Sequence, residues 1–221
     1  MHITLAPDPI VLMSDPRVTA IPVTDCGEPL VDVRGTLVVD DRRADTAGSY
    51  AHLRRGVLDR LVHAQSLLPD GLRLLFVEGY RPPDLQRLYF EEYAGELRAA
   101  NPAWSDEQVH QAASRYVSPP EIAPHSAGAA VDLTLVDAEG TELDMGTRVN
   151  ASPEESDGAC YTDAASIGPQ ARANRKLLAD ALSAAGLVNY STEWWHWSYG
   201  DRYWALTVGQ PAATYGPRRL H

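Results

Sequence analysis

The chain has 221 residues, of which 44% are hydrophobic and 22% are charged, as is ordinary for a globular protein with a sizeable core. Its formal net charge of −11 argues against non-specific binding to nucleic acids or to anionic membrane surfaces. The sequence shows neither a secretion signal at its start nor an apolar stretch near the roughly 18 residues of a membrane span. We therefore expect a single cytoplasmic domain over residues 1–221 that binds neither nucleic acid nor membrane.

The first half of the chain predicts an irregular start followed by a helix, a strand and a turn. Residues 1–35 read as irregular chain with short strands, packed on the rest of the domain. The stretch 49–68 has apolar residues at helical spacing and predicts an amphipathic helix. The apolar run 72–77 predicts a buried strand, and the segment Gly79-Tyr80-Arg81-Pro82 predicts a sharp turn directly after it.

Two helices are expected next. Residues 84–100 have helical spacing, and Ser105 begins another helix with the pattern of a capping box. Pro119-Pro120 ends this helical region and leads to His125 in a loop. The alternation of residues 130–136 predicts a central strand.

The remaining chain predicts a long loop, a helix and two strands. The polar segment 146–168 has no periodicity and predicts a surface loop at the edge of a cleft. Residues 170–185 predict a helix, and strands are expected around 187–191 and 195–208. Because helices and strands mix without regular βαβ alternation, we predict an α+β fold whose mainly antiparallel central sheet is flanked by helices.

His125 and Asp132 are the first candidates for metal ligands. Their separation of seven residues does not place them on one face of a helix, but it suits a loop ligand followed by a strand ligand. Gly128 lets the chain bend between them. A carboxylate buried at the start of an apolar strand is costly unless it is paired or bound to metal. The alternative interpretation is an Asp132 that caps a turn and a His125 that faces solvent.

A second candidate pair lies in the aromatic segment Glu193-Trp194-Trp195-His196. Regular strand alternation places Trp194 and His196 on one face and Glu193 on the other, so Glu193 needs a bulge or a strand start to join His196. Two histidines and one aspartate are the donor types of a catalytic zinc that keeps one position open. The alternative is an aromatic core strand with a hydrogen-bonded histidine.

Arg81 is the third candidate. An arginine in a turn after an apolar strand points out of the sheet edge, and its planar guanidinium suits a carboxylate or a developing oxyanion. The alternative is a surface arginine that forms a salt bridge with an acid such as Glu78 or Asp84.

These three blocks together resemble the zinc D-alanyl-D-alanine dipeptidases of the VanX type, which belong with zinc D,D-carboxypeptidases and hedgehog-like folds. The matching segments are 78–82, 125–132 and 193–196, and the resemblance extends from about residue 30 to residue 203. It implies a D,D-peptidase-like fold, a small peptide substrate and one Zn²⁺ per chain. It also implies that His125, Asp132 and His196 bind the zinc. Glu193 would then be the general base, and Arg81 would stabilise the oxyanion.

Two positions depart from the family pattern. Ala123 and Asn150 stand where the family commonly has a serine and an aspartate that help to hold the substrate's ammonium group. Losing a charge-assisted partner costs about 1.5–3 kcal/mol, so we expect D-Ala-D-Ala to bind weakly or the amino end of the substrate to differ. We count Ala123, Asn150 and Trp194 as predicted substrate-binding positions. The nearby loop offers acids that would compensate, namely Asp144, Glu154, Glu155, Asp157 and Asp163.

The sequence therefore predicts a zinc-dependent peptidase that cleaves D-alanyl-D-alanine or a related D,D-dipeptide, with Glu193 as general base. A peptidoglycan D,D-carboxypeptidase or endopeptidase is one alternative, although the lack of a secretion signal counts against it. A zinc-stabilised binding module without catalysis is another, although such a module needs neither Glu193 nor Arg81. Antibiotic resistance, cell-wall recycling and metabolite processing are all compatible with this chemistry.

Overall fold

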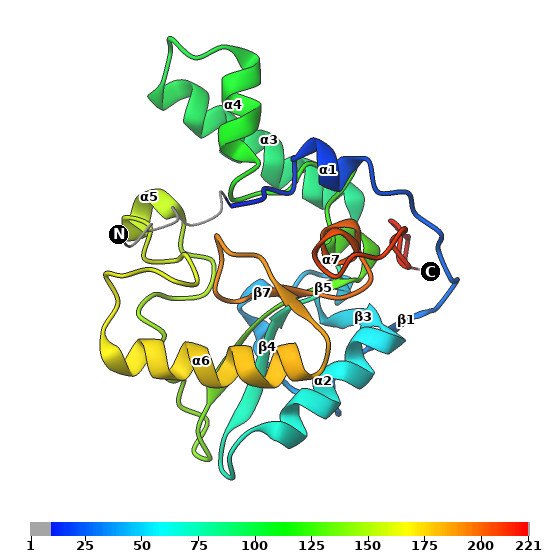
Figure 1. The fold of residues 1–221 in the computed structure, drawn as a ribbon, viewed down its shortest axis with the longest axis vertical. Coiled ribbons are helices and arrows are strands. Elements are labelled where there is room, and N and C mark those ends of the chain that lie inside the picture. The colour runs from blue at the N-terminus through cyan, green and yellow to red at the C-terminus, as the bar shows by residue number, and fades with distance from the viewer. Residues whose placement is uncertain (1–9, 221) are drawn as a thin grey trace, which may run out of the picture.

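Five strands form the central sheet of the computed structural model, which describes residues 10–220. The strand order is β2-β4-β5-β7-β6, and the sheet lies at the centre of the molecule (Figure 1). Strand β2 pairs in parallel with β4, whereas the other neighbours are antiparallel. The predicted α+β class is confirmed, with a sheet that is mixed rather than purely antiparallel. The strand bounds are Val38–Val39 (β2), Arg73–Glu78 (β4), Ala130–Val136 (β5), Val188–Asn189 (β6) and His196–Ser198 (β7).

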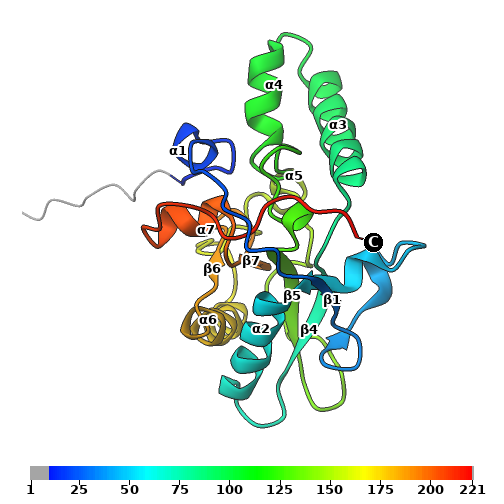
Figure 2. The same cartoon turned by 90° about the vertical axis from the view of Figure 1, so that its right-hand side faces the viewer.

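Two helices cover one face of this sheet. Helix α2 (Arg55–Leu67) and helix α6 (Pro169–Ala184) lie side by side there (Figures 1 and 2). Strand β5 contributes Leu133 and Leu135 to the core that these helices share with the sheet. Because successive strand residues point to opposite faces, Asp132 and Thr134 point away from the helices. The face opposite α2 and α6 is therefore the one that carries polar side chains.

A small second sheet precedes α2. Strands β1 (Leu30–Asp32) and β3 (His52–Arg54) pair antiparallel, with Val31 opposite Leu53. The predicted helix over 49–68 is therefore wrong at its start: residues 49–51 form a 3-10 turn (η2) and residues 52–54 are extended. The apolar spacing of Leu53 fits a strand as well as a helix, and pairing with β1 decides between them.

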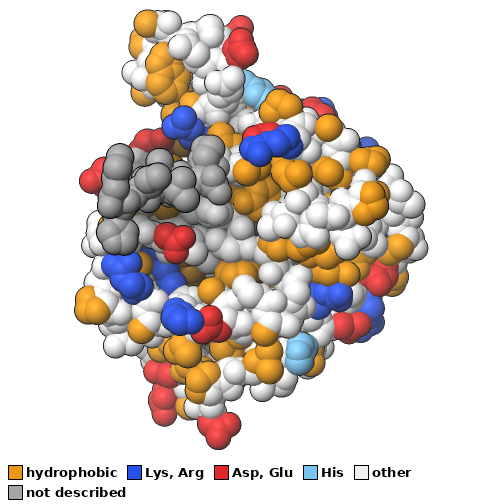
Figure 3. Space-filling model, in the orientation of Figure 1, with side chains coloured by type: hydrophobic (Ala, Val, Ile, Leu, Met, Phe, Trp, Pro, Cys, Tyr) orange, Lys and Arg blue, Asp and Glu red, His pale blue; other side chains and the backbone are white. Residues whose placement is uncertain are grey.

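Helix α3 (Pro83–Ala100) and helix α4 (Asp106–Ala113) form a hairpin that projects from the body of the molecule (Figures 2 and 3). The predicted capping box is present, because the Ser105 hydroxyl accepts from the Gln108 backbone N–H and the Gln108 side chain accepts from the Ser105 N–H. The hairpin has a small apolar core of its own, which includes Phe90, Leu97, Val109, Ala113 and Val117.

The remaining helices are short. Helix α1 (Pro16–Thr19) lies in the segment predicted as irregular, of which residues 1–9 lie outside the described part. Helix α5 (Pro153–Ser156) interrupts the predicted loop 146–168. The predicted strand 195–208 is wrong beyond Ser198, because helix α7 (Arg202–Thr207) follows. Gly200 at φ +79° turns the chain, and the Asp201 carboxylate then caps α7 by accepting from the Trp204 backbone N–H at 2.7 Å.

Among residues 10–220, no helix has both the length and the apolar composition needed to cross a membrane.

Candidate metal centre and active site

Three titratable residues lie in one row across the sheet. Asp132 on β5 is directly opposite Glu78 on β4 and directly opposite His196 on β7. A bulge in β4 between Phe76 and Glu78 adjusts the register of that strand. Directly opposed residues share a face and have Cβ atoms about 4.5–5.5 Å apart. The strand pairing itself therefore brings these three side chains together on the face away from α2 and α6.

His125 reaches this row from the 3-10 turn η3 (His125–Ala127). Gly128 follows in the left-handed region at φ +65°, and a Cβ there would lie 2.2 Å from the Leu30 side chain, so only glycine fits the bend. The Nδ1 atom of His125 lies 2.6 Å from the Gly79 carbonyl oxygen. Because a carbonyl only accepts hydrogen bonds, Nδ1 carries the proton, and the Nε2 lone pair is left to face the row.

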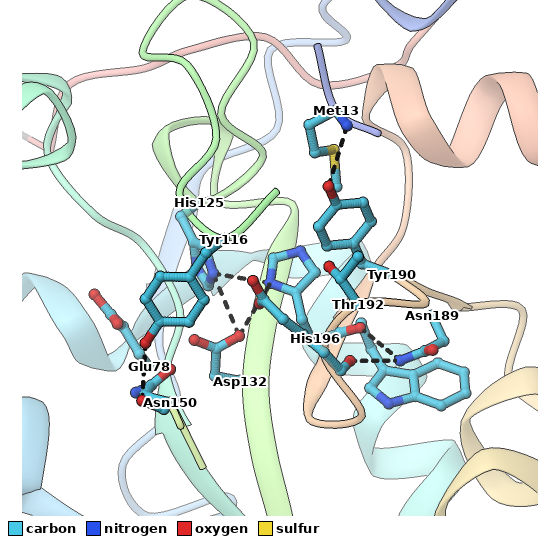
Figure 4. Close-up of polar contacts among 12 residues, drawn as sticks. Met13, Glu78, Tyr116, His125, Asp132, Asn150, Asn189, Tyr190, Thr192 and His196 are labelled. Carbon is cyan, nitrogen blue, oxygen red and sulfur yellow. Dashed lines mark hydrogen bonds and ion pairs between the residues drawn. The ribbon is translucent and has the colours of Figure 1, made fainter. Parts of the chain in front are cut away.

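The three predicted metal ligands converge (Figure 4). The Nδ1 atom of His196 lies 3.0 Å from Asp132 Oδ1 and 3.2 Å from His125 Nε2. The remaining pair, His125 Nε2 and Asp132 Oδ1, is separated by 3.4 Å. All three side chains are buried, and their ligand atoms lie within 4.8 Å of one another. The loop and the two strands thus aim two nitrogens and one oxygen at a common point.

The chemistry of these donors fits a divalent cation. Within residues 10–220, the buried Nε2 of His196 has no hydrogen-bond partner, so its Nδ1 carries the only short contacts of that ring. Two imidazoles and one carboxylate form an N₂O donor set, and zinc in a catalytic site takes three such protein ligands and leaves one position open. Donor atoms this close together suit a single ion that binds all of them.

A tight turn places Glu193 beside the donors. The His196 backbone N–H donates to the Glu193 carbonyl at 3.2 Å, and the Asn189 amide donates to the carbonyls of both residues at 3.0 Å. Strand β7 begins at His196, which is the strand start that the sequence required for Glu193 to join the histidine. As a result, the Glu193 Oε2 atom lies 3.7 Å from His196 Nδ1.

The two carboxyl groups of this centre have opposite pKa shifts. Burial raises the pKa of Glu193 well above its usual range, and the charge of Asp132 raises it further. Burial also acts to raise the pKa of Asp132, but His125 and His196 outweigh it and lower that pKa below its usual value. Two nearby acids with diverging pKa values suit different roles: Asp132 stays ionised, whereas Glu193 can accept and hold a proton.

Arg81 forms the salt bridge with Glu78 that was one of its two interpretations, but it is buried and does not lie on the surface. Its guanidinium donates from Nε and Nη2 to the two oxygens of Glu78 at 2.7 and 2.6 Å, and from Nη1 to Gln86 at 2.9 Å. Burial acts to lower the pKa of Arg81, but the ion pair with Glu78 raises it above its usual value. Arg81 is therefore a fixed cation, and it lines the same cavity as His125 and Glu193.

A cavity of about 390 Å³ opens over the donor atoms. Sequence reasoning missed most of its wall, above all the face of α3 that carries Tyr89, Glu92, Tyr93 and Glu96. The i, i+3 and i+4 spacing of these residues is the one signal by which the sequence marks them as a common face. The other missed lining residues are Arg43, Gln86, Tyr116, Val117, Ser118, Arg148 and Tyr190.

Only one of the three predicted substrate-binding positions lies in this cavity. Asn150 lines it, at φ +61°, and its carbonyl accepts a hydrogen bond from the Tyr116 hydroxyl at 2.8 Å. Ala123 is buried outside the cavity. Trp194 also lies outside, because β7 begins only at His196 and the Trp194 ring turns into the core, where its Nε1 donates to Thr147 Oγ1 at 2.8 Å.

Comparison with known proteins connects the chain to one peptidase family. A family model described as D-ala-D-ala dipeptidase matches residues 53–212. A D-alanyl-D-alanine dipeptidase of Synechocystis sp. is 30% identical over 221 aligned positions, which span 86% of this chain and 90% of the relative. A D-alanyl-D-alanine dipeptidase of Escherichia coli is 33% identical over 128 positions, which span 58% of this chain and 55% of the relative.

A solved structure also shows similarity. It is a mutant of the vancomycin resistance D,D-pentapeptidase VanY, from a VanB-type resistance cassette, in complex with Zn(II). The match has a TM-score of 0.44 and 16% identity, and it covers 86% of this chain and 90% of that chain.

Proposed function

The chain belongs to the D-ala-D-ala dipeptidase family and is a peptidase, and from this premise we propose that it hydrolyses short D,D-peptides, with D-alanyl-D-alanine or a close relative as substrate. The observation that carries the proposal is the position of Glu193, whose carboxylate lies 3.7 Å from a three-donor cluster inside one cavity. A structural metal site requires no such acid, whereas hydrolysis requires a proton acceptor at that place.

We assign one zinc ion to His125 Nε2, the Asp132 carboxylate and His196 Nδ1. Zinc bound by these donors would supply a Lewis acid for the scissile carbonyl and lower the pKa of water to about 7. Two features of the chain position these donors. The Gly79 carbonyl fixes the His125 tautomer, and the strand register fixes Asp132 against His196.

Glu193 acts as the general base in this proposal. It takes the proton from the attacking water and later donates it to the leaving amine, and its raised pKa makes the ionised carboxylate a stronger proton acceptor than an exposed glutamate. Arg81 lies in the same cavity and is held rigidly by Glu78, so its positive charge can stabilise the oxyanion without reorganisation.

The cavity also offers groups for the substrate's ammonium. The acids of the loop 137–163, which the sequence suggested as compensation for Ala123 and Asn150, do not line the cavity. Two glutamates of α3, Glu92 and Glu96, do line it. An anionic wall therefore persists on a different element, and this favours a dipeptide with an unblocked amino end.

A panel of dipeptides tests the proposal. The zinc-loaded protein is incubated with D-Ala-D-Ala, L-Ala-D-Ala, L-Ala-L-Ala and N-acetyl-D-Ala-D-Ala, and the products are quantified by mass spectrometry. We expect release of D-alanine from D-Ala-D-Ala and none from the L,L-peptide. Hydrolysis of the L,L-peptide alone, or of no peptide in the panel, would contradict the proposal.

A further inference from the structure

We propose that Arg43 binds the carboxyl-terminal carboxylate of the substrate, and this inference rests on the function proposed above. Arg43 is the last residue of the 3-10 turn η1 (Asp41–Arg43), which follows β2 at the edge of the sheet. No part of the sequence pattern pointed to it. Its side chain nevertheless lines the cavity over the metal centre.

Of the three arginines that line the cavity, Arg43 alone has two η nitrogens that both lack a hydrogen-bond partner among residues 10–220. Arg81 places three nitrogens on Glu78 and Gln86. Arg148 donates to the carbonyls of Val149 and Asn150 and to the carboxylate of Glu155. By contrast, Arg43 makes a single hydrogen bond, in which Nε donates to Glu78 Oε2 at 3.3 Å, and its two η nitrogens donate to no described residue.

The charges around Arg43 leave room for one more anion. Glu78 is a single carboxylate shared by two guanidinium groups, those of Arg43 and Arg81. Both groups also lie over the ring of Tyr89, at 5.1 and 5.0 Å from its centroid. The cluster therefore has a net positive charge, and the planar tip of an arginine suits a carboxylate bound through two parallel hydrogen bonds.

The position fits the length of a dipeptide. Three covalent bonds separate the scissile carbonyl carbon from the terminal carboxylate carbon, which is roughly one Cα–Cα step of about 3.8 Å. Arg43 contacts Glu78, and Glu78 is directly opposite the metal-ligand residue Asp132 in the sheet. Arg43 and the metal-ligand residues line one cavity, so we place the carbonyl of the substrate at the metal centre and its carboxylate at the guanidinium of Arg43. A longer peptide extended past its second residue would instead bring an uncharged peptide group there.

The test compares the dipeptide acid with its amide. The zinc-loaded wild type, R43Q and R43K are assayed on D-Ala-D-Ala and on D-Ala-D-Ala-amide. In R43Q we expect kcat/KM for the acid to fall about tenfold or more, mainly through KM, and kcat/KM for the amide to stay within about twofold. R43K keeps the charge without the planar tip, and its kcat/KM for the acid should lie between the values of wild type and R43Q. An equal fall for both peptides, or no fall for either, would overturn the assignment.

The adjacent Arg42 supplies the matched control. It lies on the same turn, pairs with Asp40 and Glu142 and does not line the cavity, so R42Q should keep the wild-type ratio of acid to amide. A carboxylate could come from the end of the peptide or from a side chain. D-Ala-D-Glu-amide, whose only carboxylate is in its second side chain, separates these two sources. If R43Q lowers the cleavage of this peptide as much as it lowers the cleavage of D-Ala-D-Ala, the assignment to the terminal carboxylate is overturned.

Failure of the proposed function has a different signature. If the wild type cleaves no dipeptide, calorimetry on the same zinc-loaded proteins still decides the role of Arg43. Tighter binding of the acid than of the amide, lost in R43Q and kept in R42Q, supports a carboxylate site at Arg43. Equal binding of acid and amide by the wild type overturns it.

Discussion

Two buried charged clusters of this protein use their hydrogen-bonding capacity in opposite ways. Arg54 is fully buried, and its guanidinium donates to the carbonyls of Ala127 and Gly216 at 2.8 and 2.9 Å and to the Asp25 carboxylate at 2.6 Å. It also donates to the carbonyl of Glu28 at 2.5 Å. In the proposed metal centre, the donor atoms of His125, Asp132 and His196 instead face one another.

The difference separates a structural charge from a functional one. A buried charge whose donors are all occupied by its own chain has nothing left for a ligand. A buried cluster whose donor atoms converge without filling their bonding capacity indicates a ligand. The two clusters also cooperate, because the carbonyl that Arg54 binds belongs to Ala127, only two residues after His125. Arg54 therefore holds the loop from which His125 reaches the proposed metal centre.

The largest expected effect concerns the acid beside the donors. Glu193→Gln keeps the size of the side chain but removes its ability to accept the water proton. We expect kcat for D-Ala-D-Ala to fall by about 10²–10⁴-fold, which is the usual contribution of a general base. Zinc content measured by mass spectrometry should stay at one per chain. A variant with near wild-type turnover would show that another group accepts the proton.

Arg54 tests the structural side of the comparison. Arg54→Met removes a buried charge and its hydrogen bonds to Asp25 and to three carbonyls, so we expect a loss of about 3–5 kcal/mol in the free energy of unfolding. Urea denaturation measures this loss. The exposed Arg17, which pairs with Asp15, is the control, and Arg17→Met should change stability by no more than about 1 kcal/mol. Similar losses in both variants would contradict the distinction between the two arginines.

Zinc should stabilise the fold by binding His125, Asp132 and His196. At free zinc 100-fold above its dissociation constant, linkage predicts about 2.7 kcal/mol of added stability. Adding a chelator should remove this increment and lower the melting temperature in calorimetry. His196→Ala should lose the response to zinc, because it removes one of three ligands. An equal response of wild type and His196→Ala would place the stabilising zinc elsewhere.

The smallest expected effect lies in the projecting hairpin. Ser105→Ala removes the capping box of α4 and should cost about 1 kcal/mol, measured by urea denaturation. Because α4 lies behind α3, which forms the cavity wall, we expect kcat/KM for D-Ala-D-Ala to change less than about threefold. A loss of activity comparable to that of Glu193→Gln would mean that the hairpin positions the centre itself.

The sequence predicted the local parts of the centre better than their assembly. The spacing of His125, Gly128 and Asp132 correctly indicated a loop followed by a strand, and β7 starts where Glu193 required it. The row formed by Glu78, Asp132 and His196 depends on strand register, which is a non-local property that no single segment contains.

Other features failed for physical reasons of the same kind. Residues 52–54 pair with β1 instead of continuing the predicted helix, because a distant partner decides between two conformations that the spacing allows. Trp194 looked like a site residue, but the turn before β7 rotates it into the core. Arg43 reaches the cavity from a turn with no recognisable pattern, so only the folded chain reveals it.

Anomalous X-ray scattering at the zinc edge, from crystals of the zinc-loaded protein, tests the convergence of the three donors most directly. The account predicts one strong peak per chain, bound at about 2.0–2.2 Å by His125 Nε2, a carboxylate oxygen of Asp132 and His196 Nδ1. A peak that lies away from these atoms, or that is bound through His196 Nε2, would contradict it.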